Sequence, residues 1–264
     1  MDTGDMSSAP SVTSSVPYLT AVNCSVGLPL GQIDLDRASA LGLDRIELWW
    51  PWSTPEPGTD AVDDLVAELR RRGLTLTALN LWGGDTSAGE RGVLHDAPLT
   101  QAHLDAHARL AEQTGADQFN LLVGRGGREL TDAQRRHVAA VAESVAARGL
   151  GTVLVEPSRS PGEGRADYPL QVIEEAALLT DTIDGTALLV DFWHLAETMG
   201  PEAIGLWLDG LGGQDGQDAL PAHVQIADDP GRGAPGTGTL PLADWVAALH
   251  GAGYVGDVAG EWVW

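Results

Sequence analysis

Short apolar runs alternate with longer amphipathic segments along most of the chain. The short runs have the length and residue types of buried strands, and the longer segments repeat their apolar residues at helical spacing. Eight strands are predicted, at 18–25, 45–50, 74–82, 118–123, 152–156, 187–192, 222–227 and 258–262. Seven helices are predicted between them, at 34–41, 61–72, 100–114, 132–148, 170–182, 201–211 and 242–252.

This alternation predicts an α/β fold in which the strands pair in parallel. Gly73, Gly115 and Gly149 each follow a predicted helix, where a left-handed C-terminal residue is favoured. Eight strand–helix units in about 250 residues are typical of a closed (β/α)8 TIM barrel. The competing open, doubly wound sheet is disfavoured because residues 23–29 lack a G-x-G-x-x-G turn. Since the chain ends two residues after strand eight, the final covering helix is expected to be absent.

The domain organisation predicted is a disordered tail at 1–17, followed by one barrel domain at 18–264. The tail is rich in Ser, Thr and Pro and has no basic residue or apolar run, so it resembles no signal or transit peptide. No segment approaches the roughly 18 apolar residues of a membrane span. The single cysteine, Cys24, allows no intramolecular disulfide, which favours a cytoplasmic setting.

Charge and composition exclude several classes of function. The 264 residues carry 38 acidic and 15 basic side chains, a formal net charge of −23, which disfavours nucleic acid as a partner. All basic residues are Arg, so lysine-dependent Schiff-base, pyridoxal phosphate and Walker-A chemistry is excluded. A small molecule is therefore the expected partner, and the surface left by the absent helix favours a homo-oligomer.

Polar residues end the last four predicted strands, where barrel enzymes place their functional side chains. Glu156, Asp191, Gln225 and Glu261 are separated by 35, 34 and 36 residues, about one strand–helix unit each. This spacing predicts that the four side chains converge at one side of the barrel mouth. A single such acid is more simply explained as a helix cap or a solvated residue, but each of these acids follows an apolar run without a basic neighbour.

Carboxylates this close together would repel one another unless a cation lies between them. One divalent metal ion per chain is therefore predicted, held by Glu156, Asp191, Gln225 and Glu261. Oxygen ligands and the lack of an obvious histidine ligand favour Mg²⁺ or Mn²⁺, while Zn²⁺ or Co²⁺ would be tolerated. We expect metal contact to lower the pKa of both glutamates.

The histidines divide into two groups. His223 precedes Gln225 by two residues, so both face the barrel interior, where His223 either binds substrate or is a hydrogen-bonded wall residue. Five others fall on helices or loops and are expected on solvated faces. They are His95, His103, His107, His137 and His250.

Several segments at the strand ends share a pattern with a known family. They are Asn23-Cys24-Ser25, residues 45–52 with Glu47, Asn80, GDTSAGERG at 84–92, VEP at 155–157, DFWH at 191–194, HVQIADDPGR at 223–232 and GYVGDVAGEW at 253–262. Through them the chain resembles the hydroxypyruvate isomerase-like branch of the xylose-isomerase-like barrels, over nearly its whole length after the tail.

The resemblance implies roles for particular residues. Glu156 and Glu261 match the family's proton-transferring pair, and with Asp191 and Gln225 they match its metal ligands. His194 and Arg232 match positions that contact substrate oxygens. Arg232 lies in a loop at 227–240 that is rich in Gly and Pro.

The implied activity is a metal-dependent aldose–ketose type isomerisation of a small hydroxy-carbonyl compound or sugar acid in carbohydrate metabolism, with hydroxypyruvate and tartronate semialdehyde as the pair. A metal would polarise the carbonyl and stabilise an enediolate while two glutamates move the proton. Return of the proton to the same carbon would instead make a ketose 3-epimerase. Less favoured alternatives are an endonuclease-type phosphodiesterase and a non-catalytic sugar-binding barrel.

Overall fold

The computed structural model describes residues 16–160, 168–211 and 220–264. Its eight strands are β1 (Ala21–Asn23), β2 (Arg45–Leu48), β3 (Thr75–Asn80), β4 (Gln118–Asn120), β5 (Thr152–Val155), β6 (Thr186–Asp191), β7 (His223–Ile226) and β8 (Val258–Gly260). Its α-helices are α1 (Asp36–Leu41), α2 (Thr59–Arg72), α3 (Gln101–Thr114), α4 (Asp132–Ala147), α5 (Ile173–Thr180), α6 (Phe192–Thr198), α7 (Pro201–Leu211) and α8 (Leu242–Gly251). A short 3-10 helix, η1, covers Thr86–Ala88.

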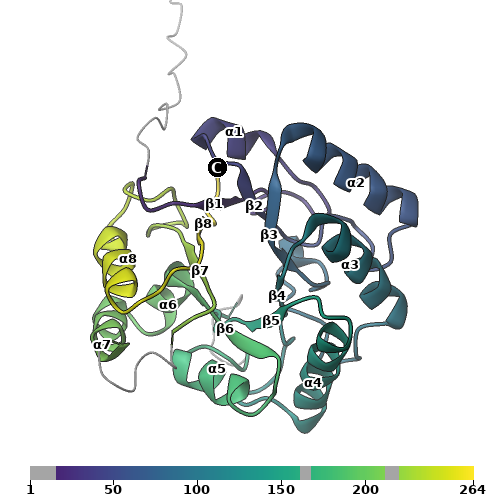
Figure 1. Cartoon of the computed structure of the whole chain (residues 1–264). Coiled ribbons are helices and arrows are strands. Elements are labelled where there is room, and N and C mark those ends of the chain that lie inside the picture. The colour runs from purple at the N-terminus through teal and green to yellow at the C-terminus, as the bar shows by residue number, and fades with distance from the viewer. Residues whose placement is uncertain (1–15, 161–167, 212–219) are drawn as a thin grey trace, which may run out of the picture.

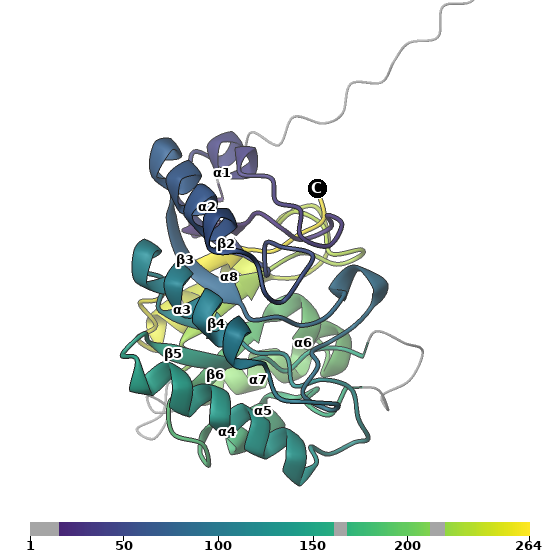
Figure 2. The ribbon, with the colours of Figure 1, turned by 90° about the vertical axis from the view of Figure 1, so that its right-hand side faces the viewer.

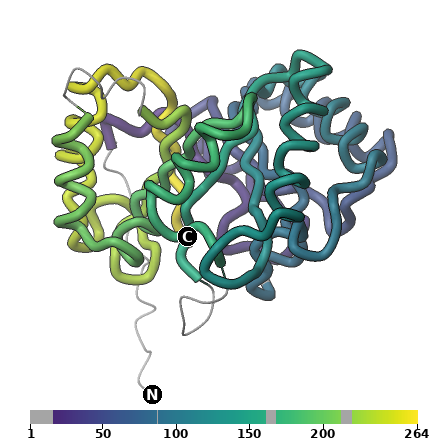
Figure 3. The backbone as a smooth tube through the Cα atoms, turned by 90° about the horizontal axis from the view of Figure 1, so that it is seen from below, coloured from purple at the N-terminus to yellow at the C-terminus, as the bar shows by residue number. Residues whose placement is uncertain are grey.

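The strands form a closed parallel barrel in chain order, and β1 completes the ring by pairing with β8. In Figure 1 the strands occupy the middle of the molecule and the helices surround them. The side view in Figure 2 shows α2, α3 and α4 along the outer wall, and Figure 3 shows the course of the backbone from below. The closed ring confirms the predicted (β/α)8 TIM barrel and excludes the open, doubly wound sheet.

Alternation along the strands sends apolar side chains toward the helices and polar ones into the barrel. On β2, Ile46 and Leu48 are fully buried against the surrounding core. Glu47, between them, hydrogen bonds to residues of β1 and β7 and so faces the barrel interior. The strands thus present a polar interior at their C-terminal ends.

Several helices begin and end at residues that cap their backbone amides or carbonyls. Thr131 caps α4 through a capping box with Gln134, and Thr100 caps α3 by accepting a hydrogen bond from the His103 amide. Gly73 and Gly115 have positive φ at the ends of α2 and α3, as predicted. Residues 261–264, which follow β8, form no helix. Within the described ranges, no helix has the length and apolar character needed to cross a membrane.

The predicted boundaries are wrong in two respects. The strands are shorter than the apolar runs, because buried residues such as those at 121–123 continue as irregular chain after β4. The segment after Asp191 is α6, a helix that the pattern did not predict because it starts directly at the strand end and spans only 7 residues. Residues 1–15 of the predicted tail lie outside the described residues, and Val16 already packs against the core.

Two histidines of α3 are buried, contrary to the expectation of solvated faces. His107 packs its ring edge-on against Phe119 at 4.3 Å between centroids, and His103 packs on Trp50 at 4.4 Å. The helix presents this face to the sheet, so the rings lie in the protein interior. Burial lowers the pKa of His103 to about 4 and that of His107 to about 3.

These buried neutral histidines should make the fold sensitive to acid. Below pH 6.5 His103 and His107 bind protons in the unfolded chain but stay neutral in the folded protein. The free energy of unfolding therefore falls as pH falls. Each ring should remove about 2 kcal/mol from the free energy of unfolding between pH 8 and pH 5. Urea unfolding at pH 8 and pH 5 should therefore show that the free energy of unfolding decreases less between these pH values for His107→Leu than for the unaltered protein.

Leucine at the exposed His250 provides the matched control, and His250→Leu should leave the pH dependence unchanged. An equal loss of stability in His107→Leu and in the unaltered protein would refute the assignment of the acid sensitivity to this ring.

Candidate active site

Each strand of the barrel delivers a polar residue to its C-terminal end. The strand register places Asn23 beside Glu47 and Asp191 beside Gln225. Because the strands are parallel and the barrel is closed, these side chains converge at one mouth. The full ring consists of Asn23, Glu47, Asn80, Asn120, Glu156, Asp191, Gln225 and Glu261.

Asp191 is held in one orientation by the start of α6. Its Oδ1 accepts hydrogen bonds from the backbone amides of Trp193 at 2.8 Å and His194 at 3.4 Å, as an N-cap. Its Oδ2 accepts a hydrogen bond from Arg232 Nη2 at 2.7 Å. One oxygen of Asp191 thus starts the helix and the other is directed into the site.

Glu156, Asp191 and His194 form a cluster whose ligating atoms lie within 4.8 Å of one another. His194 Nε2 is 3.5 Å from Glu156 Oε1 and 3.8 Å from Asp191 Oδ2. Asn120 donates a hydrogen bond to the other Glu156 oxygen at 2.7 Å. This arrangement could hold a cation, and it includes a nitrogen ligand that sequence patterns did not indicate. An imidazole nitrogen suits Zn²⁺ and Co²⁺, so this cluster does not favour Mg²⁺ or Mn²⁺ over them.

Glu261 is fixed from three directions on the opposite side of the ring. Its Oε1 accepts hydrogen bonds from Trp49 Nε1 at 2.6 Å and from Asn23 Nδ2 at 3.1 Å. Its Oε2 accepts a hydrogen bond from Arg232 Nη2, and its backbone carbonyl accepts one from Arg232 Nε at 2.9 Å. Arg232 therefore links Glu261 to Asp191.

Gln225 and His223 share a buried partner, Glu47. The Gln225 amide donates to Glu47 Oε2 at 2.8 Å, and His223 Nε2 contacts Glu47 Oε1. His223 thus faces the barrel interior as predicted, but it does not line the cavity that Glu156 and Glu261 border in the described structure. Its position fits the wall histidine better than the substrate ligand.

One buried atom supports the presence of a cation site on the strength of the structure alone. Gln225 Oε1 is buried and accepts no hydrogen bond from any described group. A carbonyl oxygen in that state is normally satisfied by a donor or a cation. With three carboxylates and an imidazole nearby, the donor set at this mouth fits a divalent ion.

Burial and mutual repulsion govern the protonation of the site. Burial and then the neighbouring Asp191 raise the pKa of Glu156 to about 7. Burial also raises the pKa of Glu261 well above its ordinary value, although Arg232 opposes this rise. For His194, burial and the nearby charges of Arg232 and Arg91 lower the pKa well below 6.5. Protein groups alone thus leave the negative charge of the carboxylates incompletely compensated.

The loop at 227–240 is organised around a single buried carboxylate. Asp228 Oδ2 accepts hydrogen bonds from the amides of Gly236 and Gly238, both at 2.9 Å. Asp228 Oδ1 accepts one from Leu240 N at 3.0 Å. Arg232 lies within this loop at a φ of 59°, a left-handed conformation that is uncommon for a residue with a side chain. The loop holds the Arg232 backbone so that its guanidinium enters the site.

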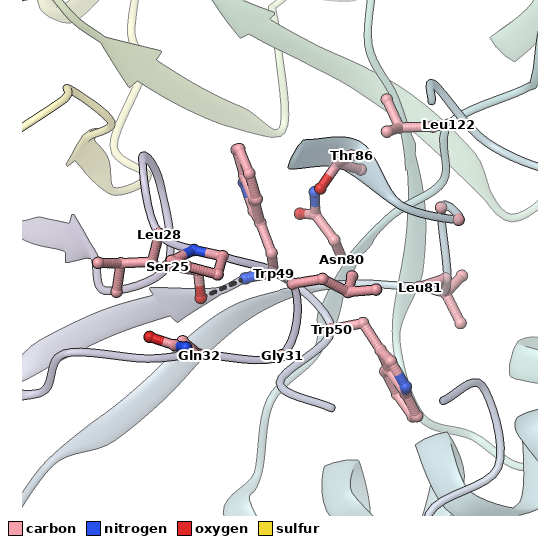
Figure 4. A pocket seen from close by; sticks show the side chains of 14 residues that line it. Ser25, Leu28, Gly31, Gln32, Trp49, Trp50, Asn80, Leu81, Thr86 and Leu122 are labelled. Atoms are coloured by element: carbon pink, nitrogen blue, oxygen red, sulfur yellow. Dashed lines mark hydrogen bonds between the residues drawn. The ribbon is translucent and has the colours of Figure 1, made fainter. Parts of the chain in front are cut away.

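A cavity opens onto these groups and continues into a second pocket. The residues lining it are Trp49, Asn80, Thr86, Arg91, Leu122, Glu156, Ser158, His194, Arg232 and Glu261. The adjoining pocket in Figure 4 shares Trp49, Asn80, Thr86 and Leu122 with it. There Ser25 Oγ accepts a hydrogen bond from the Trp49 amide, and Trp49 and Trp50 point in opposite directions. Trp49 thus forms the inner wall, while Trp50 packs toward α3.

Comparison with known proteins identifies the family to which this chain belongs. A model of the family described as Xylose isomerase-like TIM barrel matches residues 35–263. The chain belongs to this family. Its relatives include a Streptomyces coelicolor protein that is provisionally named hydroxypyruvate isomerase, 35% identical over 240 residues, covering 85% of this chain and 82% of that protein.

Two further proteins extend the comparison. Hydroxypyruvate isomerase of Escherichia coli is 26% identical over 241 residues, covering 86% of this chain and 85% of that protein. A crystal structure of AP endonuclease, family 2, from Brucella melitensis has a TM-score of 0.72 at 24% identity, with 93% of each chain covered. The structural likeness shows the shared barrel, and the named relatives indicate isomerase activity for the family members that resemble this chain.

Sequence reasoning found most of the candidate residues but missed the partners that orient them. Glu156, Asp191, Glu261, His194 and Arg232 do come together, and their catalytic and ligand roles stay predictions. Glu47 and Asn120 were assigned no role, although each lies at a strand end and hydrogen bonds to a candidate ligand. Polar residues interrupting apolar strands were the available signal.

The Asp228 network predicts a specific effect on the loop. Asp228→Asn should leave backbone amides without acceptors and reduce the free energy of unfolding by about 1–3 kcal/mol. Hydrogen exchange at Gly236, Gly238 and Leu240 should speed up, as mass spectrometry of the 227–240 peptides would show.

Asp229→Asn, at the half-buried neighbouring position, should change the exchange of these amides little. Equal exchange in Asp228→Asn and in the unaltered protein would show that the carboxylate does not organise the loop.

Proposed function

We propose that this protein is a divalent-metal-dependent isomerase of a small hydroxy-carbonyl compound or sugar acid, of the hydroxypyruvate and tartronate semialdehyde type. The observation that carries the proposal is that Glu156 and Glu261 line one cavity together with His194 and Arg232. Two carboxylates facing the same small space can serve as acid and base on one substrate. The relatives named as hydroxypyruvate isomerases support the substrate class.

A divalent ion held by Glu156, Asp191, Gln225 and Glu261, with His194 as a further ligand candidate, would polarise the substrate carbonyl and stabilise the enediolate. One glutamate removes the proton from the hydroxyl-bearing carbon, and the other delivers a proton to the adjacent carbonyl carbon. The hydroxyl proton passes to the former carbonyl oxygen, which completes the exchange of carbonyl and hydroxyl. Arg232 has a planar guanidinium that suits carboxylate or vicinal oxygens. Trp49 and Leu122 limit the access of water to the reacting carbons.

The two glutamates differ in their hydrogen-bond partners. Glu156 accepts a hydrogen bond from a neutral amide, Asn120, while Glu261 contacts the charged Arg232. Burial raises the pKa of both carboxyls, so one glutamate can hold a proton while the other removes one.

The metal content of the purified protein tests the site directly. Elemental analysis after incubation with Mg²⁺ or Mn²⁺ should find about one divalent ion per chain. The Glu156→Gln, Glu261→Gln double variant should lose it, whereas Glu143→Gln, an exposed position on α4, should retain it. Unaltered protein without bound metal under these conditions would remove the basis of the proposed mechanism.

Proton transfer is tested by turnover in deuterium oxide. The protein with added Mn²⁺ should convert hydroxypyruvate to tartronate semialdehyde, with the isotope content of the product followed by NMR. Glu156→Gln and Glu261→Gln should each lower kcat by about 10²–10⁴-fold. Glu197→Gln, exposed on α6, should leave kcat unchanged. Ligand binding without any C–H exchange would favour a non-catalytic barrel, and exchange only at C3 of a ketose would favour an epimerase.

A further inference from the structure

The Arg232 guanidinium lies among the carboxylates predicted to bind the metal. Its Nη2 donates to Asp191 Oδ2 at 2.7 Å and also contacts Glu261 Oε2. The Arg232 side chain is 11% exposed, and the carboxylates it joins are 0% and 4% exposed. One buried positive charge is thus already shared by two of the candidate metal ligands, and it compensates only part of their negative charge.

A guanidinium and a divalent ion cannot share these oxygens without loss. Both need the lone pairs of Asp191 Oδ2 and Glu261 Oε2, and two adjacent cations in a buried site repel each other. Occupancy of the ligands by Arg232 therefore competes with metal binding.

The surroundings of Arg232 leave room for a second position of its side chain. Arg232 borders the inner cavity with Glu156 and Glu261, and also an outer cavity lined by Arg159, Trp193 and Gly231. Its guanidinium carbon is 5.0 Å from the centre of the Trp193 ring, which lines the outer cavity. The loop fastened by Asp228 fixes the backbone, so rotation of the side chain alone moves the charge.

We propose that Arg232 is an internal counter-ion that holds Asp191 and Glu261 in the metal-free protein and is displaced when a divalent ion binds. The freed guanidinium then turns toward the substrate space, where it binds an anionic oxygen. Metal binding would thus precede substrate binding. The inference rests on the proposed metal-dependent function, and it adds a competition between this arginine and the ion.

The test compares Mn²⁺ binding by calorimetry in metal-free protein and in Arg232→Asn, since asparagine tolerates the left-handed backbone. If the ligands are free in only a fraction of the unaltered protein, its apparent affinity is reduced by that fraction. Arg232→Asn should therefore bind Mn²⁺ about tenfold more tightly or better. The melting temperature of the variant should fall without metal and recover toward the unaltered value with Mn²⁺.

Arg91→Gln is the matched control for charge. Arg91 borders the same cavity, but its Nη1 donates to the backbone carbonyls of Thr86 at 3.4 Å and Glu90 at 2.9 Å. This variant removes one positive charge without freeing a candidate ligand, so its affinity should change less. Arg232→Lys keeps the charge but loses the planar contact, so its affinity for Mn²⁺ should be intermediate. This variant still tests the proposal if Arg232→Asn does not fold.

The outcomes separate this inference from the proposed function. Unchanged or weaker Mn²⁺ binding in Arg232→Asn, or equal tightening in Arg91→Gln, overturns the counter-ion role while leaving the metal site in place. Binding that appears only in Arg232→Asn supports the competition. Failure of every protein to bind Mn²⁺ rejects both the metal site and the counter-ion.

Discussion

The burial of four carboxylates at one end of a closed barrel is the constraint on which the rest of this molecule depends. Glu47, Glu156, Asp191 and Glu261 are each at most 5% exposed. Buried charge of one sign is costly unless every oxygen finds a donor or a cation. The surrounding groups supply these donors. Side-chain amides, an indole, a guanidinium and the first backbone amides of a helix all donate hydrogen bonds to the carboxylate oxygens.

Local structure around the mouth follows from the same demand. Asp191 starts α6 because the first amides of a helix need acceptors, and this in turn places Trp193 and His194 over the site. Asp228 gathers amides of the following loop, which then carries Arg232 to Glu261. Polar contacts to buried carboxylates therefore set the conformation of both α6 and the loop after β7. Apolar side chains at the mouth would offer these backbone amides no acceptors.

The distribution of charge differs between the mouth and the whole chain. The protein carries a formal net charge of −23, yet Arg91, Arg159 and Arg232 gather at the cavity. Arg159 and Arg232 both lie over the ring of Trp193. Burial and then the combined field of these arginines lower the pKa of His194. The same field would attract an anionic ligand to a surface that otherwise repels it.

The architecture was predictable from the chain because it depends on local periodicity. The eight apolar runs and their spacing predicted the closed barrel, and the intervals of 35, 34 and 36 residues predicted that Glu156, Asp191, Gln225 and Glu261 share one face. These are properties of repeated strand–helix units, in which each strand end returns to the same side of the barrel. The family resemblance added the reaction type, which spacing alone did not contain.

Contacts across the barrel were decided only by the tertiary structure. Glu47 meets Gln225 178 positions away, and Trp49 meets Glu261 212 positions away, so no local pattern encodes either pairing. The burial of His103 and His107 depended on which face of α3 packs on the sheet. Sequence determined which groups reach the mouth of the barrel. Closure of the ring decided which of them touch, because hydrogen-bond partners for buried charges come from strands that are distant in the chain.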